Sequence, residues 1–339
     1  MLFNPSRMLF LSTLIMGSLI AISSTSWLGA WVGLEINLLS FIPLMTHNNQ
    51  FSAEAALKYF LVQALASALL LFAVIMIYSV QSYLISNFQF YPPHLLISSA
   101  LFLKMGAAPF HFWFPGVMEG LSWSCNMLLM TWQKIAPLML TSYIISVNYF
   151  SIFIIMSSAI AGSLGGFNQT SLRKIMAYSS INHLGWMTAA LMVSDSIWLL
   201  YFGFYSFLSL TSVILFNQFQ LSHLNQIYSL PLSSPFIKML IFGNLFSLGG
   251  LPPFTGFFPK WMVIQTLVAL DHLFLISFMV IMTLITLFFY LRITYSAILL
   301  THSEPKWMMN QTNINAFLLF LVSLSLLGLP LSCLVMFMY

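Results

Sequence analysis

Residues 109–115 read Pro-Phe-His-Phe-Trp-Phe-Pro, and residues 253–259 read Pro-Phe-Thr-Gly-Phe-Phe-Pro. Both follow the pattern Pro-Phe-x-x-aromatic-Phe-Pro, and their starts lie 144 residues apart. Each proline removes a backbone donor and clashes with the preceding turn, so each stretch is expected to interrupt or kink a helix. Small residues precede both stretches, Ala107-Ala108 in one and Gly249-Gly250 in the other. The sequence therefore predicts two discontinuous helices.

The composition around these breaks is that of a membrane protein. Of 339 residues, 60% are hydrophobic and only 5% are charged, with a net charge of +4. A typical soluble domain has roughly 25% charged residues. These values exclude a soluble domain, a disordered tail and a nucleic-acid binder. Because a transmembrane helix takes roughly 20 residues, we predict an all-α polytopic membrane protein with about eleven transmembrane helices.

Apolar runs separated by Pro, Gly, Asn and charged residues locate these helices. The predicted spans are 3–22, 26–45, 53–78, 94–113, 121–146, 149–166, 174–193, 196–219, 235–270, 272–300 and 315–337. The span 235–270 is too long for one straight pass, so it must bend at the second break. The longest connections are expected to be short loops at 79–93, 220–234 and 301–314. We divide the chain into an N-terminal helix (1–22), a translocation core (23–300), and a final loop and helix (301–339).

The basic residues predict the orientation of the chain. Odd-numbered helices start on the same side of the membrane as the N-terminus. The basic residues on that side are Arg7, Lys58, Arg173, Lys174, Lys238 and Lys306. The loops of the opposite side carry only Asp195 and Asp271. Since Lys and Arg accumulate on the inner side of membranes, the N-terminus is predicted to face the inner compartment and the C-terminus the outer one. Neither of the two cysteines, Cys125 and Cys333, suggests a disulfide framework or a metal site.

Four charged residues are predicted to lie deep in the membrane. Glu35, Lys104 and Lys134 are central in their predicted spans, and Lys260 directly follows the second break. A lone charge at the bilayer centre costs about 2.5–3.5 kcal/mol on the most lenient scale. One carboxylate cannot neutralise three lysines, and desolvation and mutual repulsion both favour loss of a proton from a buried ammonium. We therefore interpret these residues as proton carriers rather than as structural ion pairs.

Three further residues are weaker candidates. His183, central in 174–193, is a possible proton relay, although a lone histidine in a span can simply bond to a neighbouring helix. Glu54 and Lys58 lie four residues apart on one helix face. They form either a surface pair at a helix entrance or a point of proton entry.

The sequence also indicates what kind of chemistry to expect. A pair of Pro/Gly-interrupted helices at corresponding places in two halves is typical of a transport site. Each break has a lysine beside it, Lys104 before the first and Lys260 after the second. The chain shows no phosphate-binding loop, cysteine cluster or paired central histidines. It thus has the residues of a proton path, and the driving reaction is expected in another protein or in the gradient itself.

Four motifs carry a resemblance to a known family. They read Lys-Met-Gly-Ala-Ala-Pro-Phe-His-Phe-Trp from Lys104, Thr-Trp-Gln-Lys-Ile-Ala-Pro from Thr131, Leu-Arg-Lys-Ile-Met-Ala-Tyr-Ser-Ser-Ile-Asn-His-Leu-Gly-Trp from Leu172, and Gly-Gly-Leu-Pro-Pro-Phe-Thr-Gly-Phe-Phe-Pro-Lys-Trp from Gly249. These motifs resemble the NADH dehydrogenase subunit 2 family of mitochondrial respiratory complex I, which is antiporter-like. The similarity extends from about residue 1 to residue 339.

The resemblance implies a fold and a role for each candidate residue. The family has two inverted five-helix repeats, each with one discontinuous helix. The resemblance implies that Glu35 pairs with Lys104 and that Lys134 bridges the central axis. It also implies that Lys260 is the terminal lysine facing a neighbouring antiporter-like subunit. His183 falls on the same axis.

The resemblance also implies the setting of the chain. It would be a core membrane-arm subunit of the proton-pumping NADH:ubiquinone oxidoreductase in the mitochondrial inner membrane, with its N-terminus in the matrix and its C-terminus in the intermembrane space. Its partners would be other membrane-arm subunits and the lipid bilayer, with no nucleic acid. Flavin, iron–sulfur clusters and quinone would belong to other subunits, and this chain would carry no cofactor. A stand-alone cation/proton antiporter and a purely structural subunit remain the alternatives.

Overall fold

The computed structural model describes residues 5–46, 49–81, 92–228, 235–299 and 316–336. In these ranges every regular element is a helix, apart from an isolated bridge between Ser171 and His223. The predicted all-α class is confirmed. The chain divides into two compact units, Met1–Ile154 and Ile155–Tyr339, each of which is described here by itself.

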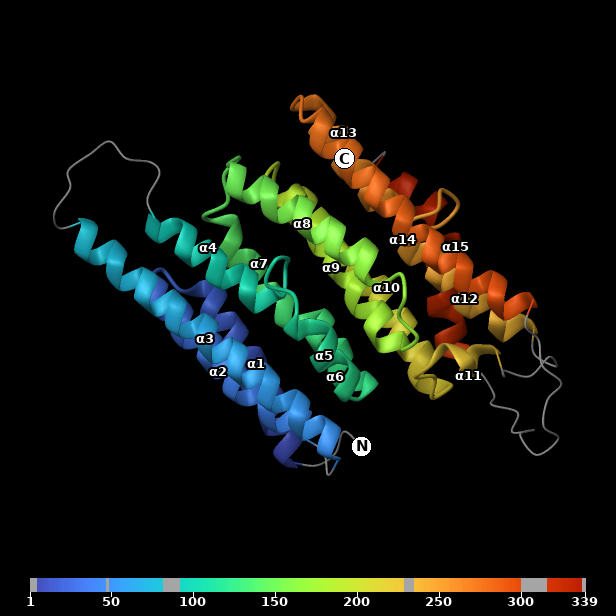
Figure 1. The fold of residues 1–339 in the computed structure, drawn as a ribbon, viewed down its shortest axis with the longest axis horizontal. Coiled ribbons are helices and arrows are strands. Elements are labelled where there is room, and N and C mark those ends of the chain that lie inside the picture. The colour runs from blue at the N-terminus through green and yellow to red at the C-terminus, as the bar shows by residue number, and fades with distance from the viewer. Residues whose placement is uncertain (1–4, 47–48, 82–91, 229–234, 300–315, 337–339) are drawn as a thin grey trace. The chain divides into compact units, whose positions relative to one another are not determined.

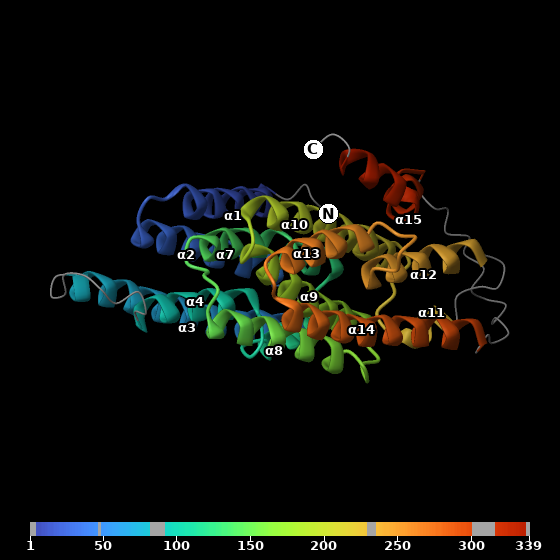
Figure 2. The same cartoon turned by 90° about the horizontal axis from the view of Figure 1, so that it is seen from above.

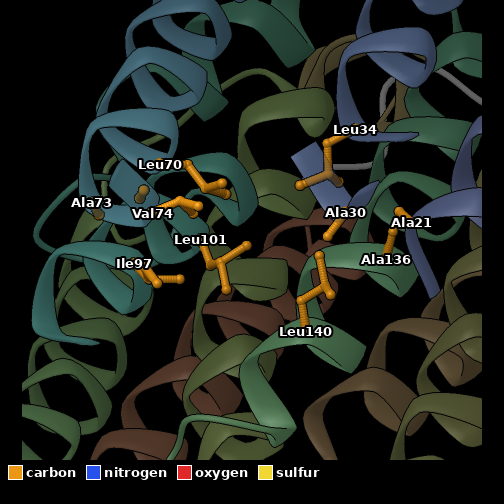
Figure 3. Close-up of a cluster of buried hydrophobic side chains, with 11 residues drawn as sticks. Ala21, Ala30, Leu34, Leu70, Ala73, Val74, Ile97, Leu101, Ala136 and Leu140 are labelled. Atoms are coloured by element: carbon orange, nitrogen blue, oxygen red, sulfur yellow. The ribbon is translucent and has the colours of Figure 1, made fainter. Parts of the chain in front are cut away.

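The first unit contains seven complete helices, labelled in Figure 1. They are α1 (Pro5–Ser23), α2 (Trp27–Met45), α3 (Gln50–Gln81), α4 (Pro92–Met105), α5 (Trp113–Gly120), α6 (Trp123–Met130) and α7 (Trp132–Ser142). Helices α3 and α4 lie side by side, as both Figure 1 and Figure 2 show. An apolar cluster from α1, α2, α3, α4 and α7, which includes Leu34, Leu70, Leu101 and Leu140, fills the space between these helices (Figure 3).

The second unit contains the remaining helices. After α8 (Tyr149–Gly165), which begins in the first unit, they are α9 (Leu172–Leu191), α10 (Asp195–Gln218), α11 (Leu224–Tyr228), α12 (Pro235–Gly249), α13 (Phe257–Ala269), α14 (Leu273–Leu299) and α15 (Ala316–Met336). Helices α8 and α9 approach closely at Gly162, where an added Cβ would lie 2.5 Å from the backbone nitrogen of Asn182. Almost all of α9 is buried, so this helix is the centre of the unit.

Both predicted helix breaks are confirmed. The first helix ends at Met105 and resumes at Trp113, and the second ends at Gly249 and resumes at Phe257. Each break begins at a glycine with a left-handed backbone, Gly106 (φ 76°) and Gly250 (φ 80°). Glycine adopts this conformation without the clash that a Cβ would cause.

The two breaks share one hydrogen-bond pattern. Ala107 N–H donates to Phe102 C=O (3.0 Å) and Gly106 N–H to Leu103 C=O (3.2 Å). Residues 144 positions later repeat both bonds, from Leu251 to Phe246 (3.3 Å) and from Gly250 to Ser247 (3.1 Å). This pair of bonds is the Schellman motif that ends helices at glycine. The repeat seen in the sequence is therefore also a repeat of backbone structure.

The predicted spans need three corrections. The span 94–113 ran through the whole break to the first residue of α5, whereas Gly106 stops α4. The span 121–146 is two helices, α6 and α7, which meet at Thr131, where the backbone departs from helical geometry (φ −108°, ψ −71°). The loop 220–234 contains α11, whose third residue, Gln226, accepts a bond from the His223 N–H (3.1 Å) in the manner of a capping box.

The other spans correspond to helices within a few residues. Five described helices are long and apolar enough to cross a membrane, namely α1, α2, α3, α10 and α14. Four shorter apolar helices lie within α4, α8, α12 and α15. The count of about eleven crossings stays a prediction. Lys306, all of the connection 301–314 and most of 79–93 lie outside the described residues.

The contact of α1 with α2 leads to a first testable prediction. A Cβ at Gly33 would lie 2.5 Å from the backbone nitrogen of Ala21. Because that atom cannot swing aside as a flexible side chain does, Gly33→Ala should destabilise the unit by about 1–3 kcal/mol. The thermal unfolding midpoint of the assembled protein measures this loss. Gly203→Ala is the control, since no atom lies within 4 Å of its added Cβ. Equal midpoints for the two variants would contradict the packing described here.

Candidate functional site

Lys104 lies in the last turn of α4, immediately before the first break, and only 7% of its surface is exposed. The break leaves the Lys104 carbonyl without its helical partner, and a side chain takes over this role: Gln63 Nε2 donates to Lys104 C=O (3.1 Å). Trp113 Nε1 adds a second donor to Leu103 C=O (3.1 Å), which also accepts from Gly106 N–H. Interrupted backbone is tolerated at membrane depth where protein groups satisfy it in this way.

Lys134 lies in the first turn of α7 and is 1% exposed. Its ammonium is 5.3 Å from the ring centre of Phe114, a cation–π distance. Phe114 belongs to α5, and its ring packs against Gly106 of the first break. The break thus positions an aromatic face next to a second buried lysine.

Lys104 and Lys134 line the same cavity, which has a volume of about 20 Å³. A cavity holds a water molecule once this measure exceeds about 10–15 Å³. The polar part of the lining also includes Tyr59, Gln63 and Gln133. Gln133 Nε2 donates to Asn37 Oδ1 across the cavity wall (2.9 Å). The space therefore suits a single water molecule in a cavity that both lysines line.

Glu35 lies on α2, half-buried, one turn from the cavity residue Leu38. Its carboxylate is the charged group that acts through space on Lys104, and it also acts on Tyr59. Glu35 itself does not line the cavity. The direct pairing of Glu35 with Lys104 therefore stays a prediction.

Lys260 lies in the first turn of α13, directly after the second break, and is 5% exposed. Its ammonium donates to the C=O of Gly249, the last residue of α12, at 2.8 Å. The carbonyl end of a helix carries a partial negative charge that favours a cation. Lys104 also lies at the carbonyl end of a half-helix, although the two lysines occupy different positions in the repeated motif.

His183 is 7% exposed on α9, and its Nδ1 lies 2.9 Å from the Tyr201 hydroxyl. This bond is compatible with both interpretations of the residue, as a relay and as a structural link to α10. Glu54 and Lys58 are exposed on α3 and do not line the cavity of Lys104 and Lys134. Their role in proton entry stays a prediction.

The site includes residues that reasoning from charge overlooked. Asn37, Tyr59, Gln63 and Gln133 all belong to the cavity wall. These residues are hard to identify from the sequence. Burying an amide or a hydroxyl in an apolar span costs less free energy than burying a charge, so no single one of them stands out. Gln63 is the most informative of them, because only the fold shows that it reaches the carbonyl of Lys104.

Two discontinuous helices with a buried lysine at each define the class as membrane-embedded transport proteins of the antiporter-like type. Comparisons with known proteins agree. Residues 24–286 match the family described as NADH:quinone oxidoreductase/Mrp antiporter, TM, and residues 287–336 match NADH dehydrogenase subunit 2 C-terminus. The chain is 58% identical to NADH-ubiquinone oxidoreductase chain 2 of Anopheles gambiae and 54% identical to that of Aedes aegypti, covering 88% of each chain compared.

Solved structures show the same fold at lower sequence identity. A chain of respiratory complex I from Thermus thermophilus superposes with a TM-score of 0.81 at 24% identity, over 96% of this chain and 79% of that one. A chain of the Mrp complex from Dietzia sp. gives 0.78 at 19% identity, over 89% and 62%. The chain belongs to the NADH-ubiquinone oxidoreductase chain 2 family.

The bond between Gln63 and the broken helix leads to a second prediction. Gln63→Met keeps the length of the side chain but leaves the Lys104 carbonyl without its donor. A buried polar group that loses its partner costs about 1–3 kcal/mol. The thermal unfolding midpoint should therefore fall, whereas Gln50→Met, at an exposed position of the same helix, should leave it unchanged. If both variants unfolded at the wild-type temperature, the carbonyl would not depend on Gln63.

Proposed function

We propose that this chain is a core membrane-arm subunit of the proton-pumping NADH:ubiquinone oxidoreductase and that it moves protons through its buried lysines. The observation that carries the proposal is the pair Lys104 and Lys134, both buried and both lining one small polar cavity beside a helix break. NADH oxidation and ubiquinone reduction take place in other subunits. The partners of the chain are other membrane-arm subunits, including a neighbouring antiporter-like subunit, and the lipid bilayer.

Each proton-transfer step depends on the electrostatic interaction between neighbouring charged groups. A carboxylate near an ammonium favours the protonated form, and its withdrawal allows the proton to leave. Glu35 acts in this way on Lys104, which then exchanges a proton with Lys134 through a water in the shared cavity. Lys260 is the terminal lysine toward the neighbouring subunit, and His183 is a relay on the same axis. Glu54 and Lys58 form a point of proton entry.

The chain is a multi-pass protein of the mitochondrial inner membrane. The distribution of basic residues supports a finer arrangement, with the N-terminus in the matrix and the C-terminus in the intermembrane space. No redox cofactor is expected in the chain. In the part of it that the structure describes, no group of three His, Cys, Asp or Glu side chains is placed to hold a metal ion.

A stand-alone cation/proton antiporter is the second candidate, and it is supported by the likeness to the Mrp complex and by a family description that includes Mrp antiporters. That likeness is one of fold, at 19% identity. The relatives at 54–58% identity are chains of NADH-ubiquinone oxidoreductase. They favour the first candidate. Proton transport by the purified chain alone in lipid vesicles would favour the second.

Substitution of Lys134 tests the proposal. Lys134→Met matches the length of the side chain and suits an apolar environment, so the complex should assemble while proton pumping falls. Lys134→Arg should also fail, because a guanidinium does not release its proton at physiological pH. The measurement is the number of protons translocated per NADH oxidised in sealed inner-membrane vesicles, at equal content of assembled complex.

Lys174→Met is the matched control, since it removes a lysine that does not line the cavity. It should retain the wild-type stoichiometry. Wild-type stoichiometry in an assembled Lys134→Met complex would show that Lys134 does not carry protons.

A further inference from the structure

A second cavity lies in the first unit, where α4 and α8 begin and α7 ends. Its volume is about 230 Å³, against about 20 Å³ for the cavity of Lys104 and Lys134. A space of this size admits a molecular group rather than one water molecule. The second cavity has no part in the proton path proposed above, so its contents need a separate explanation.

The second cavity leads inward along one face of α4. His94 is exposed at its rim, whereas Ser98 and Phe102, four and eight residues further along the same face, are buried. Thr141, in the last turn of α7, also lines the cavity and is 1% exposed. Tyr143 at the rim is 66% exposed, as is typical of tyrosines where a membrane meets water. The cavity therefore runs from the membrane surface into the unit.

The two hydroxyl groups on the walls of α4 and α7 offer acceptors to a ligand. The Ser98 hydroxyl donates its hydrogen to Leu95 C=O (2.9 Å), and the Thr141 hydroxyl donates its hydrogen to Leu138 C=O (2.7 Å). Because a hydroxyl has one hydrogen and two lone pairs, both oxygens can still accept. A ligand that bonds to them must therefore bring its own N–H or O–H groups.

The second cavity also restricts the charge of its ligand. None of the described residues that line it is Asp, Glu, Lys or Arg, so a net charge would lie there without a counterion, which is unfavourable. The carbonyl end of α7 and the amide end of α8 both border the cavity, and these helix ends carry opposite partial charges. A zwitterion matches both ends, with its cation beside Thr141 and its anion beside the start of α8.

We propose that the second cavity binds the headgroup of an ethanolamine phospholipid. Its primary ammonium has three N–H donors and bonds to the hydroxyl oxygens of Ser98 and Thr141. The rings of Phe102 and Phe150, whose centres are 6.3 Å apart, also line the cavity and favour a cation. The phosphate stays at the rim, near the start of α8, and the acyl chains remain in the bilayer. Choline has the same charge, but its quaternary nitrogen carries no hydrogen to donate.

Two matched lipid probes test the proposal. One is a phosphatidylethanolamine and the other a phosphatidylcholine, each with the same photoreactive group on an acyl chain next to the glycerol. Each probe is mixed, in the same trace amount, into phosphatidylcholine vesicles that contain the assembled complex. After illumination, mass spectrometry measures the label on residues 92–105 and 141–151, relative to the label on α1, which does not line the cavity.

We expect the ethanolamine probe to label these segments about tenfold more than the choline probe, because only ethanolamine can donate hydrogen bonds to the two hydroxyls. Ser98→Ala and Thr141→Val each remove one acceptor and should reduce this preference by about threefold or more. Ser99→Ala and Ser142→Ala are the matched controls and should keep it. Each removes a hydroxyl that donates to the carbonyl three residues earlier on the same helix, at 2.9 and 2.8 Å, but that does not line the cavity.

Several results would overturn the proposal. Equal labelling by the two probes would show that the cavity does not select a headgroup. Stronger labelling by the choline probe would assign the selection to the aromatic rings, which also attract quaternary ammonium groups. A preference that Ser98→Ala and Thr141→Val leave at the level of the controls would not arise from these hydroxyls. Loss of the preference on addition of free ethanolamine would assign the cavity to a soluble amine instead of a lipid.

Discussion

The carbonyl groups that two interrupted helices leave without partners are the constraint on which the site depends. At the first break, the side chain of Gln63 satisfies the carbonyl of Lys104. At the second, the ammonium of Lys260 itself satisfies the carbonyl of Gly249. In an apolar environment each such group must find a partner. The same requirement that stabilises the breaks therefore brings polar and charged side chains into the interior of each unit.

The sequence predicted the breaks because proline and glycine act locally. A proline lacks a donor wherever it stands, and Gly106 and Gly250 adopt left-handed backbones that other residues avoid. Most helix positions followed equally well from long apolar runs. The split between α6 and α7 did not, since it lies at a single residue, Thr131, whose backbone departs from helical geometry (φ −108°, ψ −71°). A change at one residue leaves no periodic signal.

The site was predictable only where it is charged. Lys104, Lys134 and Lys260 stand out because a buried ammonium is costly, and all three are buried. Asn37, Gln63 and Gln133 are neutral, and their contribution appears only when α2, α3 and α7 meet around one cavity.

Ordered water in the cavity shared by Lys104 and Lys134 tests the central claim most directly. The measurement is a density map of the assembled complex in lipid, at a resolution that shows individual water molecules. We predict a water within hydrogen-bonding distance of both ammonium groups and of an amide of the lining, with both lysines directed inward. A dry cavity, or lysine side chains directed at lipid, would contradict a proton path through these residues.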